Sequence, residues 1–118
     1  MKKLSKINFT IQLDEQKTPE VIEWEATDAG FEGKKLSNTL MISLWDKEEK
    51  STLAIDLWTK EMLVDDMNIH FYQIFSKMAE TYLRATKNNE AARMIEDFAF
   101  KFADKLDLIK KIDKEKFS

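Results

Sequence analysis

The sequence predicts an α+β protein in which a four-stranded antiparallel sheet precedes two long helices packed on one of its faces (β-β-β-β-α-α). Apolar residues recur at every second position up to about residue 60, which is the period of a strand with one buried face. After residue 64 they recur at every third or fourth position, which is the period of an amphipathic helix. The length of 118 residues suits one domain with one core, spanning 1–118.

The first two strands are expected near residues 6–14 and 20–27, because apolar and polar residues alternate in both. The polar stretch from Asp14 to Pro19 is expected to be the turn between them. Both glycines lie between Asp28 and Lys35, which indicates a loop after the second strand.

The third and fourth strands are expected near residues 38–46 and 51–60, joined by the charged turn from Asp46 to Lys50. Matching aliphatic residues on the two strands predict an antiparallel hairpin whose apolar side packs against the helices. These six residues form what we call the leucine face: Leu40, Ile42, Leu44, Leu53, Ile55 and Leu57.

The two helices are expected near residues 65–87 and 89–110, separated by a break at Asn88-Asn89. Asp65 or Asp66 is expected to be the N-cap of the first helix, where a carboxylate also suits the helix dipole. The apolar stripe of the first helix comprises Met67, Phe71, Ile74, Phe75, Met78 and Tyr82. The stripe of the second comprises Ala91, Met94, Ile95, Phe98, Phe102, Leu106 and Ile109.

The two ends of the chain are both basic. The start from Met1 to Lys6 resembles the opening of a signal peptide, but polar residues interrupt the apolar stretch that would have to follow it. The stretch from Lys105 to Lys116 is expected to be a frayed basic tail. No apolar run approaches the roughly 20 residues that span a bilayer, so a soluble cytoplasmic protein is expected.

Composition excludes several kinds of functional site. The chain has no cysteine, and therefore no disulfide, thiolate zinc site or cysteine nucleophile, and it has one histidine. Its net charge of −3 gives no electrostatic reason to bind nucleic acid or an anionic membrane. Because no catalytic or nucleotide-binding motif occurs either, the sequence predicts no metal, no organic cofactor and no enzymatic activity.

The single histidine and the paired carboxylates are the remaining candidates for chemistry. Asp66 lies one helical turn before His70 and could orient its ring, but no nucleophile or metal ligand lies nearby in sequence. A partly exposed helix histidine is therefore the simpler interpretation. Glu23 and Glu25 share a strand face, yet no cleft-forming segment surrounds them, so a solvated sheet face is expected.

The hairpin face opposite the leucine face carries the candidate functional residues Met41, Trp45 and Trp58. Two tryptophans and a methionine are too apolar for simple solvent exposure, which favours a protein interface, with a second copy of the chain as the preferred cover. In one alternative the loop over residues 28–38 folds over them. In another the chain leaves this apolar area exposed.

Several residue runs resemble the gliding-motility-associated GldC family of Bacteroidota. The most specific run is Thr52-Leu-Ala-Ile-Asp-Leu-Trp-Thr-Lys60, preceded by Leu44-Trp45-Asp46. The supporting pieces, spread over nearly the whole chain, are Ile7-Asn8-Phe9, Leu13-Asp14-Glu15, Pro19-Glu20, Trp24, Asp28-Ala-Gly30, Phe71-Tyr-Gln73 and Arg84-Ala-Thr86. This chain has Leu63 where the family is expected to have proline. The resemblance implies an accessory component of gliding motility and brings no catalytic residues.

The β-β-β-β-α-α order is also similar to that of the export chaperone SecB, at the level of the fold alone. That similarity implies that the apolar outer sheet face either joins copies of the chain in an oligomer or binds unfolded or exported polypeptides. Two functions therefore stay open: a non-enzymatic accessory protein of gliding motility that acts through protein–protein interaction, and a SecB-like chaperone.

Overall fold

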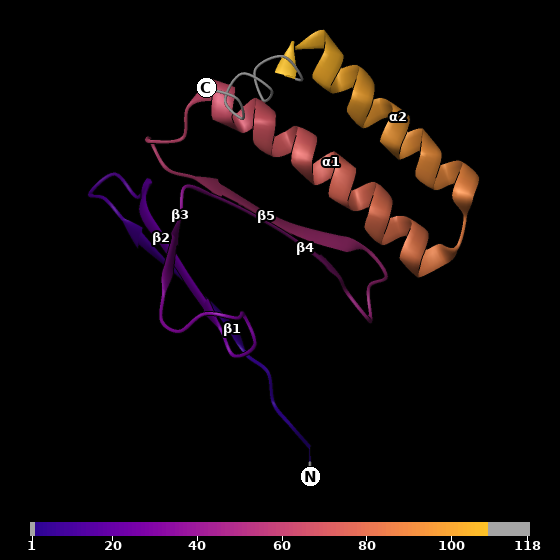
Figure 1. The fold of residues 1–118 in the computed structure, drawn as a ribbon. Helices are drawn as coiled ribbons and strands as arrows, with labels where there is room; N and C mark the ends of the chain where they lie inside the picture. The colour runs from indigo at the N-terminus through magenta and orange to yellow at the C-terminus, as the bar shows by residue number, and fades with distance from the viewer. Residues whose placement is uncertain (1, 109–118) are drawn as a thin grey trace. The chain divides into compact units, whose positions relative to one another are not determined.

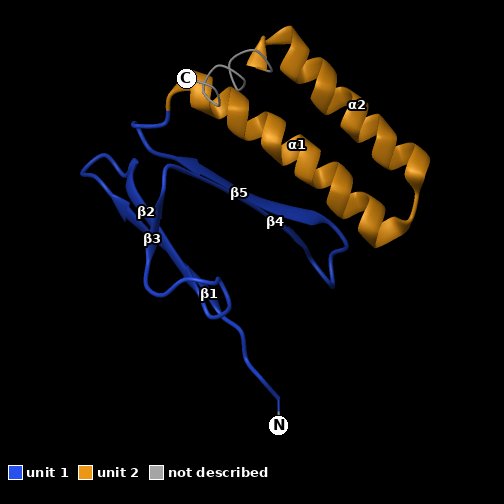
Figure 2. Cartoon of the chain, in the orientation of Figure 1, with its two compact units in different colours: residues 1–62 blue, residues 63–118 orange. Residues whose placement is uncertain are grey.

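The computed structural model describes residues 2–108, in which five strands precede two helices (Figure 1). The chain divides into two compact units, residues 1–62 and residues 63–118 (Figure 2). All the described strands belong to the first unit, and both described helices belong to the second. The predicted α+β class and the predicted change from strands to helices after residue 60 are confirmed.

The first unit contains a three-stranded antiparallel sheet in the order β1-β2-β3. Its strands are β1 (Ile7–Leu13), β2 (Pro19–Ala26) and β3 (Lys35–Ser37). Ile22 lies in the middle of the central strand and is 1% exposed, so it is the centre of this sheet's core. In the loop between β2 and β3, the Phe31 ring packs edge-on against Trp24, with 5.3 Å between ring centroids.

The first unit also contains an antiparallel hairpin formed by β4 (Thr39–Trp45) and β5 (Thr52–Trp58). The predicted hairpin is therefore confirmed. Among the described residues, these two strands make a sheet of their own.

The prediction of one four-stranded sheet is wrong, because the described strands form separate sheets of three and two. The chain changes sheets at Asn38, between β3 and β4. The Asn38 carbonyl accepts a hydrogen bond from the Thr59 N–H at 2.9 Å, and the Asn38 Oδ1 accepts one from the Thr59 hydroxyl at 3.0 Å. Residues before Asn38 pair with β2 and residues after it pair with β5. Alternation along a strand predicts its two faces but not its neighbour, so it does not predict how the strands divide between sheets. β3 was expected to be part of a loop, because three residues are too few to show alternation.

The second unit is a helical hairpin of α1 (Val64–Thr86) and α2 (Asn89–Lys105). The two predicted helices and the break at Asn88 are confirmed. In the described residues α2 ends at Lys105. The predicted helix end near residue 110, and the basic tail apart from its first residues, lie outside the described residues.

The capping prediction for α1 is wrong. The N-cap residue is Leu63, whose side chain makes no capping hydrogen bond. Asp65 and Asp66 lie in the first turn of the helix instead, where their charges favour the positive end of the helix dipole. For α2 the Asn88 side chain does cap the helix, because its Oδ1 accepts a hydrogen bond from the Ala91 N–H at 3.1 Å.

The two helices contact each other through phenylalanine and alanine side chains. The Phe75 ring of α1 lies edge-on to Phe98 and Phe102 of α2, at centroid distances of 5.2 and 5.3 Å. The buried residues of the two helices are alanines, which permit a close approach of the two backbones. They are Ala79, Ala92, Ala99 and Ala103.

Candidate interaction surface

Met41, Trp45 and Trp58 lie on one face of the β4–β5 hairpin. Opposite residues of an antiparallel pair point to the same side of the sheet, and the register pairs Thr39 with Trp58 and Trp45 with Thr52. Because residues two and four apart on a strand also share a face, the three predicted residues share one side. We call Met41, Trp45 and Trp58 the tryptophan surface.

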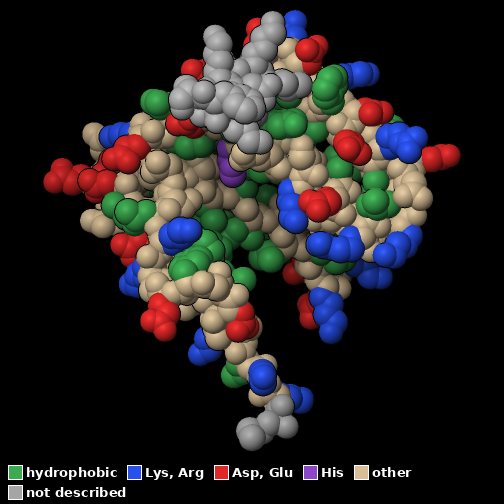
Figure 3. Space-filling view, viewed as in Figure 1, with side chains coloured by type: hydrophobic (Ala, Val, Ile, Leu, Met, Phe, Trp, Pro, Cys, Tyr) green, Lys and Arg blue, Asp and Glu red, His purple; other side chains and the backbone are tan. Residues whose placement is uncertain are grey.

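All three side chains of the tryptophan surface are exposed, by 42% at Met41, 67% at Trp45 and 56% at Trp58. The loop over residues 28–38 does not bury them. Its Phe31 packs on Trp24 of the other sheet in the same unit. Figure 3 shows hydrophobic side chains reaching the visible surface among charged ones. Within the unit of residues 1–62, the described residues therefore leave the tryptophan surface uncovered.

The tryptophan surface has an indole ring at each end. Trp45 lies at the turn end of the hairpin and Trp58 at its open end, while Ser43 and Ala54 lie opposite each other between them. Trp45 is opposite Thr52, and Thr52 and Trp58 are six positions apart on β5, which corresponds to roughly 20 Å at about 3.4 Å per residue. The two tryptophans therefore lie at opposite ends of the surface, with Met41 and the small Ser43 and Ala54 between them.

Hydrogen bonds fix both ends of this hairpin. At the turn, Asp46 Oδ2 accepts from the Glu48 and Glu49 N–H groups at 3.1 and 2.7 Å, and the Asp46 N–H donates to the Ser51 carbonyl at 2.8 Å. At the open end, Thr59 is 2% exposed and makes its two hydrogen bonds to Asn38. The tryptophan surface therefore lies on a backbone that is held at both ends.

A polar contact lies beside the open end. Lys60 Nζ is 3.4 Å from Asp14 Oδ2, which connects the residue after Thr59 to the β1–β2 turn. Hydrogen bonds from the Thr18 and Gln16 backbone N–H groups, together with the Lys60 ammonium, hold the pKa of Asp14 below its ordinary value of 3.8.

The leucine face also has exposed members, with Leu44 at 56%, Leu53 at 51% and Ile55 at 49%. The register places its residues directly opposite one another, so the grouping predicted from the sequence is confirmed. That the helices pack on this face stays a prediction.

In the described residues, His70 lies beside an aromatic ring and Glu23 beside a lysine. The His70 ring lies edge-on to Phe71, with 6.4 Å between ring centroids. Glu23 Oε2 lies 3.7 Å from Lys34 Nζ, in a surface ion pair. Among residues 2–108, no group of three or more histidine or carboxylate side chains is placed to hold a metal ion.

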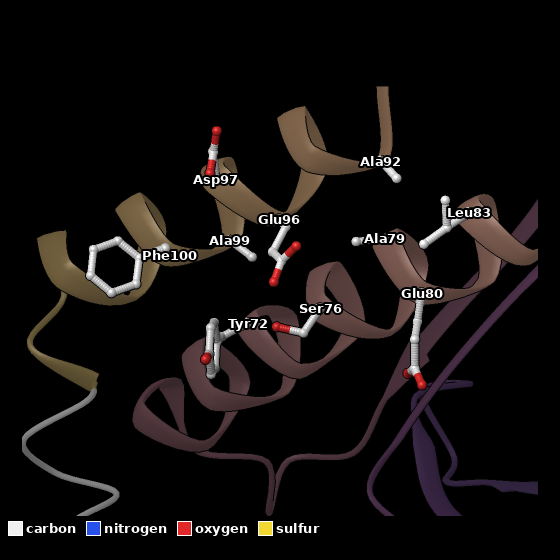
Figure 4. Close-up of a pocket in the computed structure, with 10 residues that line it drawn as sticks. All are labelled: Tyr72, Ser76, Ala79, Glu80, Leu83, Ala92, Glu96, Asp97, Ala99 and Phe100. Carbon is white, nitrogen blue, oxygen red and sulfur yellow. The ribbon is translucent and has the colours of Figure 1, made fainter. Parts of the chain in front are cut away.

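Grooves on the described part of the helical hairpin include two that the sequence pattern did not predict. One, of about 440 Å³, lies between α1 and α2; Figure 4 shows Glu96 pointing from α2 toward α1 near Ser76, while Asp97 points away. The other, of about 700 Å³, is mostly apolar. It is lined by His70, Gln73, Ile74, Lys77, Met78, Thr81, Tyr82, Ala85 and Ile95. Helical periodicity predicts which residues share a face, but not the depth of a groove between two helices.

Residues 19–108 match the family described as gliding motility-associated protein GldC-like. The chain belongs to this family. The match confirms the resemblance drawn from the residues, and it includes the whole hairpin with its tryptophan surface. No curated protein and no solved structure matches this GldC-like chain. Neither helix in the described part of the chain is both long and apolar enough to cross a membrane.

Proposed function

We propose that the chain is a non-enzymatic accessory protein of bacterial gliding motility that binds a protein partner through the tryptophan surface. Family membership supports the association with gliding motility. The observation that carries the binding role is the exposure of Trp45, Trp58 and Met41 on a hairpin held at both ends. Tryptophan and methionine are enriched at the centres of protein interfaces, and burying one large side chain contributes roughly 1.5–3 kcal/mol.

The shape of the surface suits an extended segment of the partner. A strand of about six residues spans the roughly 20 Å between the two indoles and can lie over the small Ser43 and Ala54 side chains. Aromatic side chains at the two ends then cover the segment and fix its position. An apolar partner segment is favoured, because Asp56 supplies the single charge on this face.

A complementation assay tests the proposal. In a gliding bacterium that lacks its own copy of the gene, the double variant Trp45→Ser, Trp58→Ser is expected to lose support of gliding while its far-ultraviolet circular dichroism stays as in the wild type. Phe100→Ser is the matched control, since Phe100 is an aromatic residue of similar exposure, 59%, on α2. Gliding supported equally by the double variant and the wild type would contradict the proposal.

Site-specific photo-cross-linking in the same cells tests the nature of the partner. A cross-linker at position 45 is expected to capture one stoichiometric protein, and a cross-linker at position 100 is expected not to. Capture of many unfolded chains at position 45 would favour a SecB-like chaperone instead.

The non-enzymatic part of the proposal has its own test at His70. His70→Ala is expected to leave gliding support at the wild-type level, because the ring lies edge-on to Phe71 and, within residues 2–108, belongs to no cluster that could hold a metal ion. Loss of gliding with an unchanged thermal melt would show that this imidazole has a chemical role.

A further inference from the structure

We infer that β4 pairs edge to edge with β4 of a second copy of the chain, in an antiparallel register centred on Ile42. The result is a four-stranded sheet with the order β5-β4-β4-β5. This inference goes beyond the proposed function, because the contact uses the backbone edge of β4 and not the tryptophan surface. Either can hold without the other.

The backbone hydrogen bonds show which groups of β4 are directed to its open edge. Asn38 and Thr59 are hydrogen-bonded opposite each other, as are Asp46 and Ser51 at the other end. In an antiparallel pair, hydrogen-bonded and non-hydrogen-bonded positions alternate, so the leucine-face residues of β4 bond to β5. The intervening residues direct their N–H and C=O groups away from β5. These are Thr39, Met41, Ser43 and Trp45, of which the Thr39 carbonyl already accepts one hydrogen bond, from the Ser37 hydroxyl at 2.6 Å.

The composition of β4 leaves this edge unprotected. Proteins usually protect an edge strand with charged residues, proline or a bulge, and the seven residues of β4 contain neither a charge nor a proline. Within the described chain, β5 is the strand paired with β4. An isolated two-stranded sheet is marginally stable in water, and pairing with a second hairpin makes a sheet of four strands.

Charge selects the β4 edge over the β5 edge for pairing with an identical strand. Two copies of β5 centred on Ile55 would bring their Asp56 side chains into diagonal positions on one face, where like charges repel. Two copies of β4 bring no charges together. Self-pairing through β4 therefore carries no electrostatic cost.

The open groups and the length of the strand together select the register. In an antiparallel pair the outward-directed residues of one strand must lie opposite those of the other, which several registers satisfy. The register that pairs the strand over its full length places Thr39 opposite Trp45 and Met41 opposite Ser43 of the second copy. This arrangement uses all seven residues of the strand. It places Ile42 directly opposite its own copy, at a non-hydrogen-bonded position with Cα atoms about 4.5 Å apart.

Single-cysteine cross-linking tests the register, since the chain contains no other cysteine. Ile42→Cys is expected to form a covalent dimer under mild oxidation, because about 4.5 Å between Cα atoms lies within the range of a disulfide. Ile55→Cys is the matched control. It lies opposite Ile42 on the same face and is 49% exposed, but in the proposed sheet its copy is three strand spacings away, about 14 Å. At least a several-fold excess of covalent dimer for Ile42→Cys is expected, and equal yields would contradict the register.

Proline substitution tests the edge itself, with light scattering at several concentrations as the readout. Ser43→Pro removes an outward N–H from β4 and is expected to give a monomer, whereas Ala54→Pro removes the equivalent N–H from β5 and is expected to leave the dimer. Circular dichroism checks that both variants fold. Dimers of both variants, loss of the dimer by Ala54→Pro alone, or a monomeric wild type would each overturn the inference. The gliding assay is independent of these results, so failure of this inference is distinguishable from failure of the proposed function.

Discussion

Asp14 holds the β1–β2 turn together through one carboxylate. Its Oδ1 accepts hydrogen bonds from the Gln16 and Thr18 N–H groups, both at 2.9 Å, and its Oδ2 faces Lys60. Lys17 has a φ of 64°, so the turn includes one residue in the left-handed region. The carboxylate satisfies backbone donors that the turn leaves without a strand partner.

We predict that Asp14 makes the stability of the protein depend on pH in the acid range. Its pKa is lowered in the folded chain, chiefly by the Thr18 hydrogen bond, so the ionised form stabilises the fold above the ordinary value of 3.8. This contribution is lost as the pH falls through the lower, folded pKa. The difference in melting temperature between the wild type and Asp14→Asn should therefore be constant near neutral pH and shrink below about pH 3.8.

Glu15→Gln is the control for this prediction, because it makes the same change of charge one residue away from the turn carboxylate. The difference in melting temperature between Glu15→Gln and the wild type should not shrink over this acid range. Equal pH profiles for the two variants would show that net charge, rather than the turn, causes the effect.

At the scale of residues, the sequence predicted which hairpin side chains share a face. Alternation is a property of one strand, and the register of Leu40 with Leu57 and of Trp45 with Thr52 follows it. It did not predict that small side chains such as Ala79 and Ala99 would be the most buried residues of the helices. Periodicity highlights large apolar residues, whereas two helices approach most closely where side chains are small.

At the scale of elements, the helices and the hairpin followed from local pattern, and β3 did not. β3 has three residues, which is too short for alternation to be recognised. Asn38 alone separates the end of β3 from the start of β4, so the sequence pattern could not show that these are two strands. The partner of a strand depends on contacts between segments distant in the sequence, such as Ile22 and Ser37.

We predict that the start of α2 depends on the Asn88 cap. Asn88→Ala removes the hydrogen bond from the Ala91 N–H and should lower the free energy of unfolding by about 1 kcal/mol. Asn89→Ala is the matched control, because Asn89 is the first residue of the helix and alanine favours a helical conformation. Urea unfolding monitored by circular dichroism measures the free energy of unfolding of both variants. An equal decrease in this free energy for the two variants would contradict the capping role.

At the scale of the whole molecule, the two units offer separate probes. All three tryptophans, Trp24, Trp45 and Trp58, lie in residues 1–62, and both described helices lie in the other unit. Tryptophan fluorescence therefore reports on the first unit, and helical circular dichroism reports on the second.

We predict that these two probes give one coincident unfolding transition. The length of the chain favours a single domain with one core, and neither a two-stranded hairpin nor a pair of helices is a robust fold by itself. Coincident urea midpoints for fluorescence and circular dichroism are the expected result. Two transitions separated along the urea axis would show that residues 1–62 and 63–118 fold as independent domains.

The uncharged strand β4 also affects how the chain is synthesised. During translation β4 leaves the ribosome before β5, and a run of seven apolar and small polar residues without charge, glycine or proline is typical of segments that aggregate. The charged turn Asp46–Lys50 follows at once, and β5 is complete thirteen residues after β4, from Asp46 to Trp58. At about 5–20 residues per second, the ribosome supplies the pairing strand within about 1–3 seconds. The order of strands in the gene thus limits the time for which a nascent β4 remains unpaired, and a pause in translation inside this turn would lengthen it.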